Sequence, residues 1–217
     1  MTRAGKLISA SMLASSALLA VAVWASAGAR ATPTAAARAA CLPPGARTLA
    51  SDHVAQVFSW QGSVYGCVSA TGTRHKLGGL GICNVAPGRA APVKLLGTTV
   101  AYGLERCGVD TGSSTVVIRD LASARELADI AAGTLPLGAE SYVSVASLVL
   151  GHGSTVGWIA TDTSLVRNRG QSYEVHGFTG AKSSLLDSGK AIRPSSLRLA
   201  GSRMTWRDGT ATRSAKL

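Results

Sequence analysis

The sequence predicts an all-β domain, either a propeller-like array of about four small antiparallel sheets or a β-sandwich. Short runs of alternating apolar and polar residues continue from Ala46 to the end of the chain, separated by turns of Gly, Asp, Ser and Thr. The 217 residues include 25 glycines and only 5% aromatic residues. A core must therefore be built mainly from Val, Leu, Ile and Ala. The 46% apolar and 15% charged fractions exclude a highly charged disordered chain.

The first thirty residues have the layout of an export signal. Arg3 and Lys6 precede an uncharged stretch at 7–25, and Ala25-Ser26-Ala27 supplies the small residues that a signal peptidase accepts. Residues 1–27 are therefore predicted to be a signal peptide, with an uncleaved membrane anchor as the alternative. Both alternatives place the rest of the chain outside the cytoplasm, either secreted or tethered to the membrane.

Residues 28–40 form a linker rich in Ala, Thr and Pro, and the predicted β-repeat domain spans 41–217. This domain contains all the cysteines of the chain: Cys41, Cys67, Cys83 and Cys107. An even number of cysteines in an exported chain predicts disulfides, and the pairing is open. Sequential pairing, Cys41 with Cys67 and Cys83 with Cys107, would close loops of about 25 residues, each worth about 3 kcal/mol. The cysteines and histidines lack metal-ligand spacing, so no metal site is expected.

The repeat consists of a Gly or Ser turn followed by a strand centred on an aromatic residue. The aromatic residues are between 37 and 56 residues apart, a spacing typical of propeller blades. Each is expected to fill the space between neighbouring sheets, because a small sheet with two apolar faces is stable only when it is stacked on others. The four residues are Tyr65, Tyr102, Trp158 and Trp206.

These strands carry the motifs VYGC at 64–67, TVAYG at 99–103, TVGWIA at 155–160 and RMTW at 203–206. On these motifs the chain resembles, over residues 50–217, secreted β-propeller-like repeat proteins of the TolB type. The resemblance implies a scaffold or a binding module, and it assigns no functional residue.

One segment does not follow the repeat. Residues 121–132 are rich in helix formers, and Asp120 is placed to cap a helix there. An outer strand after a turn at Asp120 is equally compatible with the sequence, so helix and strand both stay open.

Asp110-Thr111-Gly112 resembles the catalytic loop of aspartic peptidases, in which two carboxylates share one proton and activate a water molecule. Asp110 would then be the catalytic carboxylate. A homodimer would have to supply the second carboxylate, because the chain has no second DTG motif. The same residue types follow the other aromatic strands, as hairpin turns prefer, and this favours an ordinary turn. A non-catalytic protein without a cofactor is therefore expected.

The net charge of +11 is unevenly distributed. Residues 182–217 hold eight Lys or Arg against Asp187 and Asp208. This basic quarter suits an envelope component or an anionic polymer, although solvated strand faces would give the same composition. Nucleic acid is not expected as a partner, because no aromatic-basic motif is present. The sequence thus predicts an exported binding or scaffolding protein of the cell envelope or extracellular space, with a peptidase-like hydrolase as the alternative.

Overall fold

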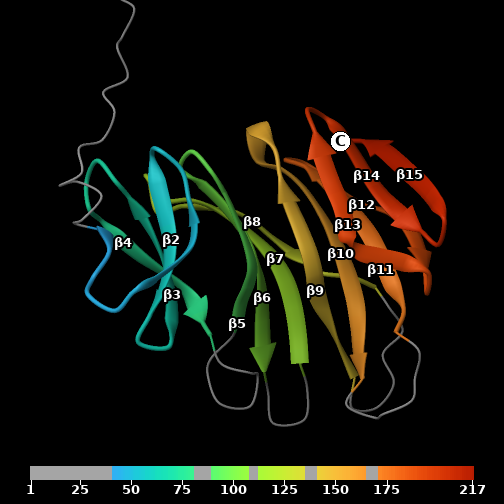
Figure 1. Cartoon of the computed structure of the whole chain (residues 1–217), viewed down its shortest axis with the longest axis horizontal. Coiled ribbons are helices and arrows are strands. Elements are labelled where there is room, and N and C mark those ends of the chain that lie inside the picture. The colour runs from blue at the N-terminus through green and yellow to red at the C-terminus, as the bar shows by residue number, and fades with distance from the viewer. Residues whose placement is uncertain (1–40, 81–88, 108–111, 135–140, 165–170) are drawn as a thin grey trace, which may run out of the picture. The chain divides into compact units, whose positions relative to one another are not determined.

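The structure is a computed structural model that describes residues 41–80, 89–107, 112–134, 141–164 and 171–217. The elements of these ranges are fifteen strands and one turn of 3-10 helix, His152–Ser154, so this part of the chain is all-β (Figure 1). It contains no helix long and apolar enough to cross a membrane. The predicted signal peptide at 1–27 and the linker at 28–40 lie outside the described residues.

The first eight strands form one sheet in chain order. Four of them are β1 (Arg47–Ser51), β2 (Ala55–Trp60), β3 (Ser63–Val68) and β4 (Arg74–Gly79). The other four are β5 (Arg89–Leu96), β6 (Thr99–Cys107), β7 (Gly112–Asp120) and β8 (Glu126–Ala131). A single parallel residue pair, Gly79 with Arg89, joins β4 to β5. It divides the sheet into two antiparallel halves, which we call unit 1 (β1–β4) and unit 2 (β5–β8).

Two further antiparallel sheets complete the described fold. Unit 3 consists of β9 (Ser141–Leu150), β10 (Thr155–Ser164), β11 (Tyr173–Thr179) and β12 (Ser183–Gly189). Unit 4 consists of β13 (Ile192–Ala200), β14 (Arg203–Asp208) and β15 (Ala211–Lys216). Tight turns connect the first and second strands of units 2 and 4, at Gly97 (φ 60°) and Gly201 (φ 58°). Glycine suits these positions because it enters the left-handed region without a steric penalty.

The segment at 121–132, for which helix and strand were both open, contains the strand β8 at Glu126–Ala131. Asp120 ends β7 and holds a turn, because its carboxylate accepts hydrogen bonds from the backbone N–H groups of Ala122 and Ser123, both at 3.2 Å. The chain then reverses and pairs with β7. Strand pairing has overridden the local preference for a helix.

A buried aromatic residue is the fourth residue of the second strand in every unit. These residues are at most 3% exposed: Phe58, Tyr102, Trp158 and Trp206. Each of the last three shares a core cluster with residues of the preceding unit. Tyr102 clusters with Val57 and Val64, and Trp158 clusters with Ala101 and Ile118. Trp206 clusters with Ile159 and Val175. Because successive side chains on a strand point to opposite faces, units 2 and 3 bury both of their faces.

Tyr65 lies in a different place from the other three predicted aromatic residues. It is on β3, the third strand of unit 1, directly opposite Phe58 on β2. The next residue, Gly66, faces unit 2, where a Cβ would overlap with the side chain of Leu121. Tyr65 therefore points to the opposite face of unit 1, and Phe58 occupies the position that corresponds to Tyr102, Trp158 and Trp206.

This outer face of unit 1 is closed by a disulfide. Cys41 and Cys67 are bridged with a Cα–Cα distance of 5.7 Å, which confirms that the chain forms a disulfide and selects one of the pairs that the sequence left open. Phe58 and both bridged cysteines are fully buried, and Trp60 and Tyr65 pack against them. We call these five residues the aromatic end face. Cys83 and the side chain of Cys107 lie outside the described residues.

Candidate binding groove

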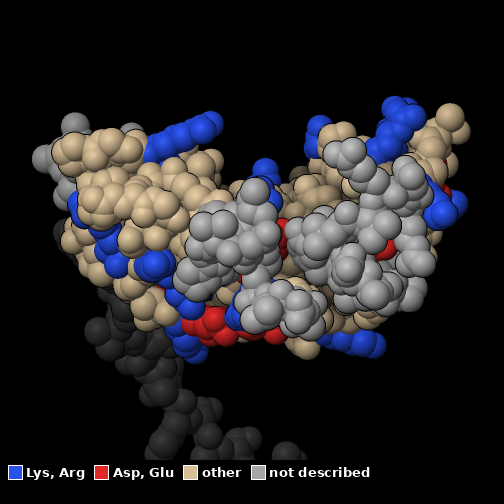
Figure 2. Space-filling model, turned by 90° about the horizontal axis from the view of Figure 1, so that it is seen from below, with Lys and Arg blue, Asp and Glu red and all other residues tan. Residues whose placement is uncertain are grey.

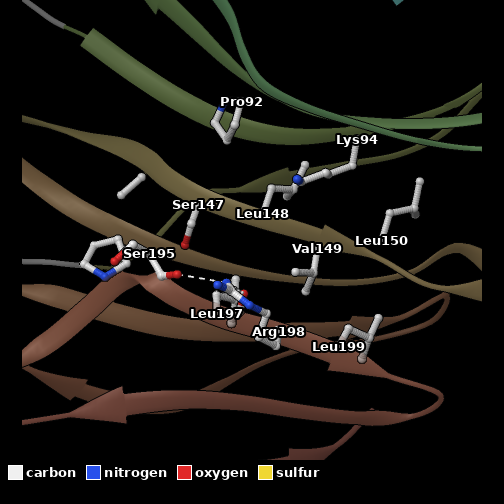
Figure 3. A pocket seen from close by; sticks show the side chains of 12 residues that line it. Pro92, Lys94, Ser147, Leu148, Val149, Leu150, Ser195, Leu197, Arg198 and Leu199 are labelled. Carbon is white, nitrogen blue, oxygen red and sulfur yellow. Dashed lines mark hydrogen bonds between the residues drawn. The ribbon is translucent and has the colours of Figure 1, made fainter. Parts of the chain in front are cut away.

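A groove of about 590 Å³ lies against β5, β9 and β13, the first strands of units 2, 3 and 4 (Figure 3). Strands β9 and β13 are the edges of their sheets. The edge of a sheet presents backbone N–H and C=O groups that no neighbouring strand has paired. The groove walls are mainly apolar, with Leu, Val and Pro side chains from all three strands, among them Pro92, Leu148, Leu150, Leu197 and Leu199.

A β-bulge shapes the wall that β9 contributes. Its register with β10 shifts between Val145 and Ser147, so that Ala146 is the extra residue. The hydroxyl of Ser147 is buried without a hydrogen-bond partner. Figure 3 shows its oxygen directed toward the space between β9 and β13. A buried hydroxyl left unpaired costs about 1–3 kcal/mol, and a polar ligand atom in the groove would offset that cost.

Two cations reach the groove from opposite sides. Lys94 extends from β5 toward β9, and Arg198 comes from β13 (Figure 3). Two backbone carbonyls of β13 fix the Arg198 guanidinium, which donates to Ser195 at 2.8 Å and to Leu197 at 2.7 Å. Neither cation forms an ion pair with any carboxylate of the described ranges. Apolar walls with two unpaired cations and one free hydroxyl suit a ligand that has an anionic group and an apolar body.

A second polar cluster is buried between units 2 and 3. The carboxylate of Glu174 accepts hydrogen bonds from the backbone N–H of Thr134 at 2.7 Å and from its hydroxyl at 2.8 Å. His176 Nε2 lies 2.9 Å from the same carboxylate. The His176 ring stacks on Trp158 with 5.1 Å between the ring centroids.

Burial and hydrogen bonding set the protonation of this cluster. Burial raises the pKa of Glu174, but the hydrogen bonds from Thr134 and His176 outweigh it and hold the pKa below its ordinary value. Burial lowers the pKa of His176, and the attraction of Glu174 offsets only part of this effect. His176 is therefore neutral at pH 7 and donates its proton to an ionised Glu174.

Trp158, on which His176 stacks, also links neighbouring units. Trp158 Nε1 donates to the carbonyl of Ala132, just beyond β8, at 2.6 Å. Trp206 Nε1 makes the corresponding bond from unit 4, to the carboxylate of Asp187 on β12, at 2.7 Å. Each tryptophan thus ties the second strand of its unit to the last strand of the unit before it. No group of His, Cys, Asp or Glu suited to a metal ion occurs in the part of the chain that the structure describes.

None of the predicted site residues that the structure describes lines the groove. Tyr102, Trp158 and Trp206 are buried between units, and Tyr65 belongs to the aromatic end face. Asp110 lies outside the described residues. The signal that could have located the groove is the apolar run before each aromatic strand, since such runs form the neighbouring first strands β5, β9 and β13.

No protein-family model matches the chain, and no curated protein matches it. What the protein binds is therefore inferred from the groove and from the exposed faces of the sheets.

Proposed function

We propose that the protein is an exported, non-catalytic binding or scaffolding protein, built as a propeller-like array in which each unit is one blade. Successive units pack in chain order through the aromatic residue of their second strand. Units 2 and 3 are covered on both faces, whereas a sandwich of two sheets covers only one face of each. The motifs shared with TolB-type propeller-like proteins support the same arrangement and a role in binding.

The ligand of this array is an anionic molecule with an apolar body, bound in the groove. The observation that carries this proposal is that Lys94 and Arg198 both line the apolar groove and that neither forms an ion pair with a carboxylate among the residues that the structure describes. Ser147, whose buried hydroxyl has no hydrogen-bond partner, adds a polar residue to the lining. The first strands of a propeller surround its axis, so a groove along three such strands is a natural place for a ligand.

A fluorescent probe of this chemistry tests the proposal. Anilinonaphthalene sulfonate combines a sulfonate with an apolar ring system, and we expect saturable binding to the native protein. Lys94→Ala with Arg198→Ala should weaken that binding by at least about tenfold. Arg47→Ala with Arg125→Ala is the matched control, because both arginines are exposed and neither lines the groove. Equal binding by native protein and groove variant would refute the proposal.

A further inference from the structure

The outer face of unit 4 is cationic. Along β14, Met204 and Trp206 are buried against unit 3, while Arg203 and Arg207 point to the other side and are exposed. The strand register places Arg193 of β13 opposite Arg207, and Lys216 of β15 opposite Arg203. We call these four residues, Arg193, Arg203, Arg207 and Lys216, the basic face; all four side chains are exposed.

The basic face consists of two like-charged pairs without a compensating carboxylate. Residues directly opposite each other on neighbouring strands are close, so two cations placed there destabilise the sheet. Asp187 and Asp208 are the only acidic residues of 182–217. Asp187 accepts the hydrogen bond of the buried Trp206, and Asp208 lies 3.9 Å from Arg213. No carboxylate of the described residues forms an ion pair with the basic face, so an external anion can neutralise it.

The spacing of the two pairs favours a polymer over a small anion. Arg203 and Arg207 are four residues apart on one strand, a separation of about 13 Å. A small anion would engage one pair, whereas an extended polyanion engages both and gains from their linkage. Figure 2 shows Lys and Arg side chains at the end of the molecule where Figure 1 places unit 4, and others at the opposite end.

The neutral residues of this face indicate which polyanion fits. Hydroxyl side chains lie between the cations, at Thr205, Thr212 and Ser214, and Ser214 accepts a hydrogen bond from Arg203 at 3.1 Å. The large apolar side chains exposed in the described ranges are all elsewhere, at Leu49, Leu80 and Leu185. The face thus has no aromatic platform on which bases could stack, and it has no apolar residue to insert into a membrane.

We propose that the basic face binds an anionic polysaccharide, a linear sugar polymer that carries a sulfate, carboxylate or phosphate on its repeating unit. The arginine forks bind the anionic groups, and the Thr and Ser hydroxyls bind the sugar. This site shares no residue with the groove lining. The groove residue Arg198 lies opposite Thr205, so the two sites are neighbours, and the probes and variants below are chosen to distinguish them.

Heparin and alginate, a sulfated and a carboxylated polysaccharide, are the probes. The native protein should bind at least one of them, with an affinity that falls steeply as salt is added. The variant Arg203→Glu with Arg207→Glu should bind at least about tenfold more weakly. This variant should fold at least as well as the native protein, because each new carboxylate lies opposite Lys216 or Arg193. Its matched control is Arg47→Glu with Arg125→Glu, which changes the net charge equally and should keep the affinity within about threefold of native.

Several outcomes would overturn the proposal. One is failure of both polysaccharides to bind, and another is binding that salt leaves unchanged. An equal loss of affinity in the control variant would show that only net charge matters. Tighter binding of an oligothymidylate or of vesicles containing anionic lipid would assign the face to nucleic acid or to a membrane. Binding of anilinonaphthalene sulfonate is measured on the same variants. Because their substitutions lie outside the groove, this result separates the two proposals.

Discussion

The aromatic end face of unit 1 and the basic face of unit 4 occupy equivalent positions with opposite chemistry. Each is the face of a terminal unit that no further described unit covers. On unit 1 it carries Phe58, Trp60 and Tyr65 under a segment tied down by the disulfide from Cys41 to Cys67. On unit 4 it carries three arginines and a lysine, all exposed.

The difference shows two ways in which an array of sheets can end. A terminal unit needs an outer face compatible with water. Unit 1 meets this requirement by packing its aromatic residues against the disulfide, so its end face contributes to the stability of the fold. Unit 4 achieves it with charge, and its directly opposed cations cost stability. We infer that the aromatic end face has a structural role and that the basic face binds a ligand.

The largest effect is expected at the repeat position of the aromatic end face. Phe58→Ala should lower the free energy of unfolding by about 3–5 kcal/mol, because the ring is fully buried. Tyr65→Ala should cost clearly less, since that side chain is partly exposed. Urea unfolding of both variants measures the difference. Equal losses would contradict the assignment of Phe58, and not Tyr65, to the repeat position.

Removal of the disulfide should have the next largest effect. Cys41→Ser with Cys67→Ser should cost about 3 kcal/mol, because the bridge closes a loop of 26 residues. The affinity of the basic face for heparin, measured below the unfolding transition, should not change. A variant as stable as the native protein would contradict the conclusion that this disulfide stabilises the aromatic end face.

Part of the pH dependence of stability should originate between the two end faces, at the junction of units 2 and 3. The pKa of His176 is lower in the folded state than its ordinary value of 6.5. The unfolded chain therefore binds more protons below that pH, and stability falls as the pH drops through 6.5. The pKa of Glu174 is also lowered, so stability falls further below its ordinary value of 4.5.

The variant His176→Gln isolates the first of these two steps. It should flatten the dependence of unfolding free energy on pH between about 6.5 and 5, relative to a control, His53→Gln. An unchanged pH profile in His176→Gln would place the acid sensitivity elsewhere.

The smallest expected effect is a gain in stability on the basic face. Arg207→Glu replaces a like-charged pair with an opposite-charged pair across from Arg193, and it should add about 0.5 kcal/mol at low salt. Arg207→Gln, which only removes the repulsion, should add less. A loss of stability in Arg207→Glu would show that the opposed cations carry no cost.

Much of the fold follows from local patterns. Alternating apolar residues between Gly-rich turns predict the strands, whereas the structure forms three sheets in place of the about four that the repeat predicts. The even cysteine count predicts the disulfide, with the pairing left open. Spacing alone does not separate Tyr65 from Phe58, because they lie opposite each other on adjacent strands. Both side chains point to the outer face of unit 1, so the alternation of faces along a strand does not distinguish them.

The candidate sites depend on contacts that no local pattern records. Lys94 and Arg198 line the same groove only because β5, β9 and β13 are neighbouring first strands. The basic composition of residues 182–217 is visible in the sequence, but the opposed pairs of the basic face require the register of β13, β14 and β15. The segment at 121–132 likewise needed its partner β7 to decide between helix and strand.

The contrast between the two end faces is tested most directly by amide hydrogen exchange of the native protein with and without heparin. We predict slower exchange in peptides that cover β14 and β15, and no change in peptides that cover β2 and β3. Slowing confined to β2 and β3, or equal slowing at both ends, would contradict the assignment of binding to the basic face.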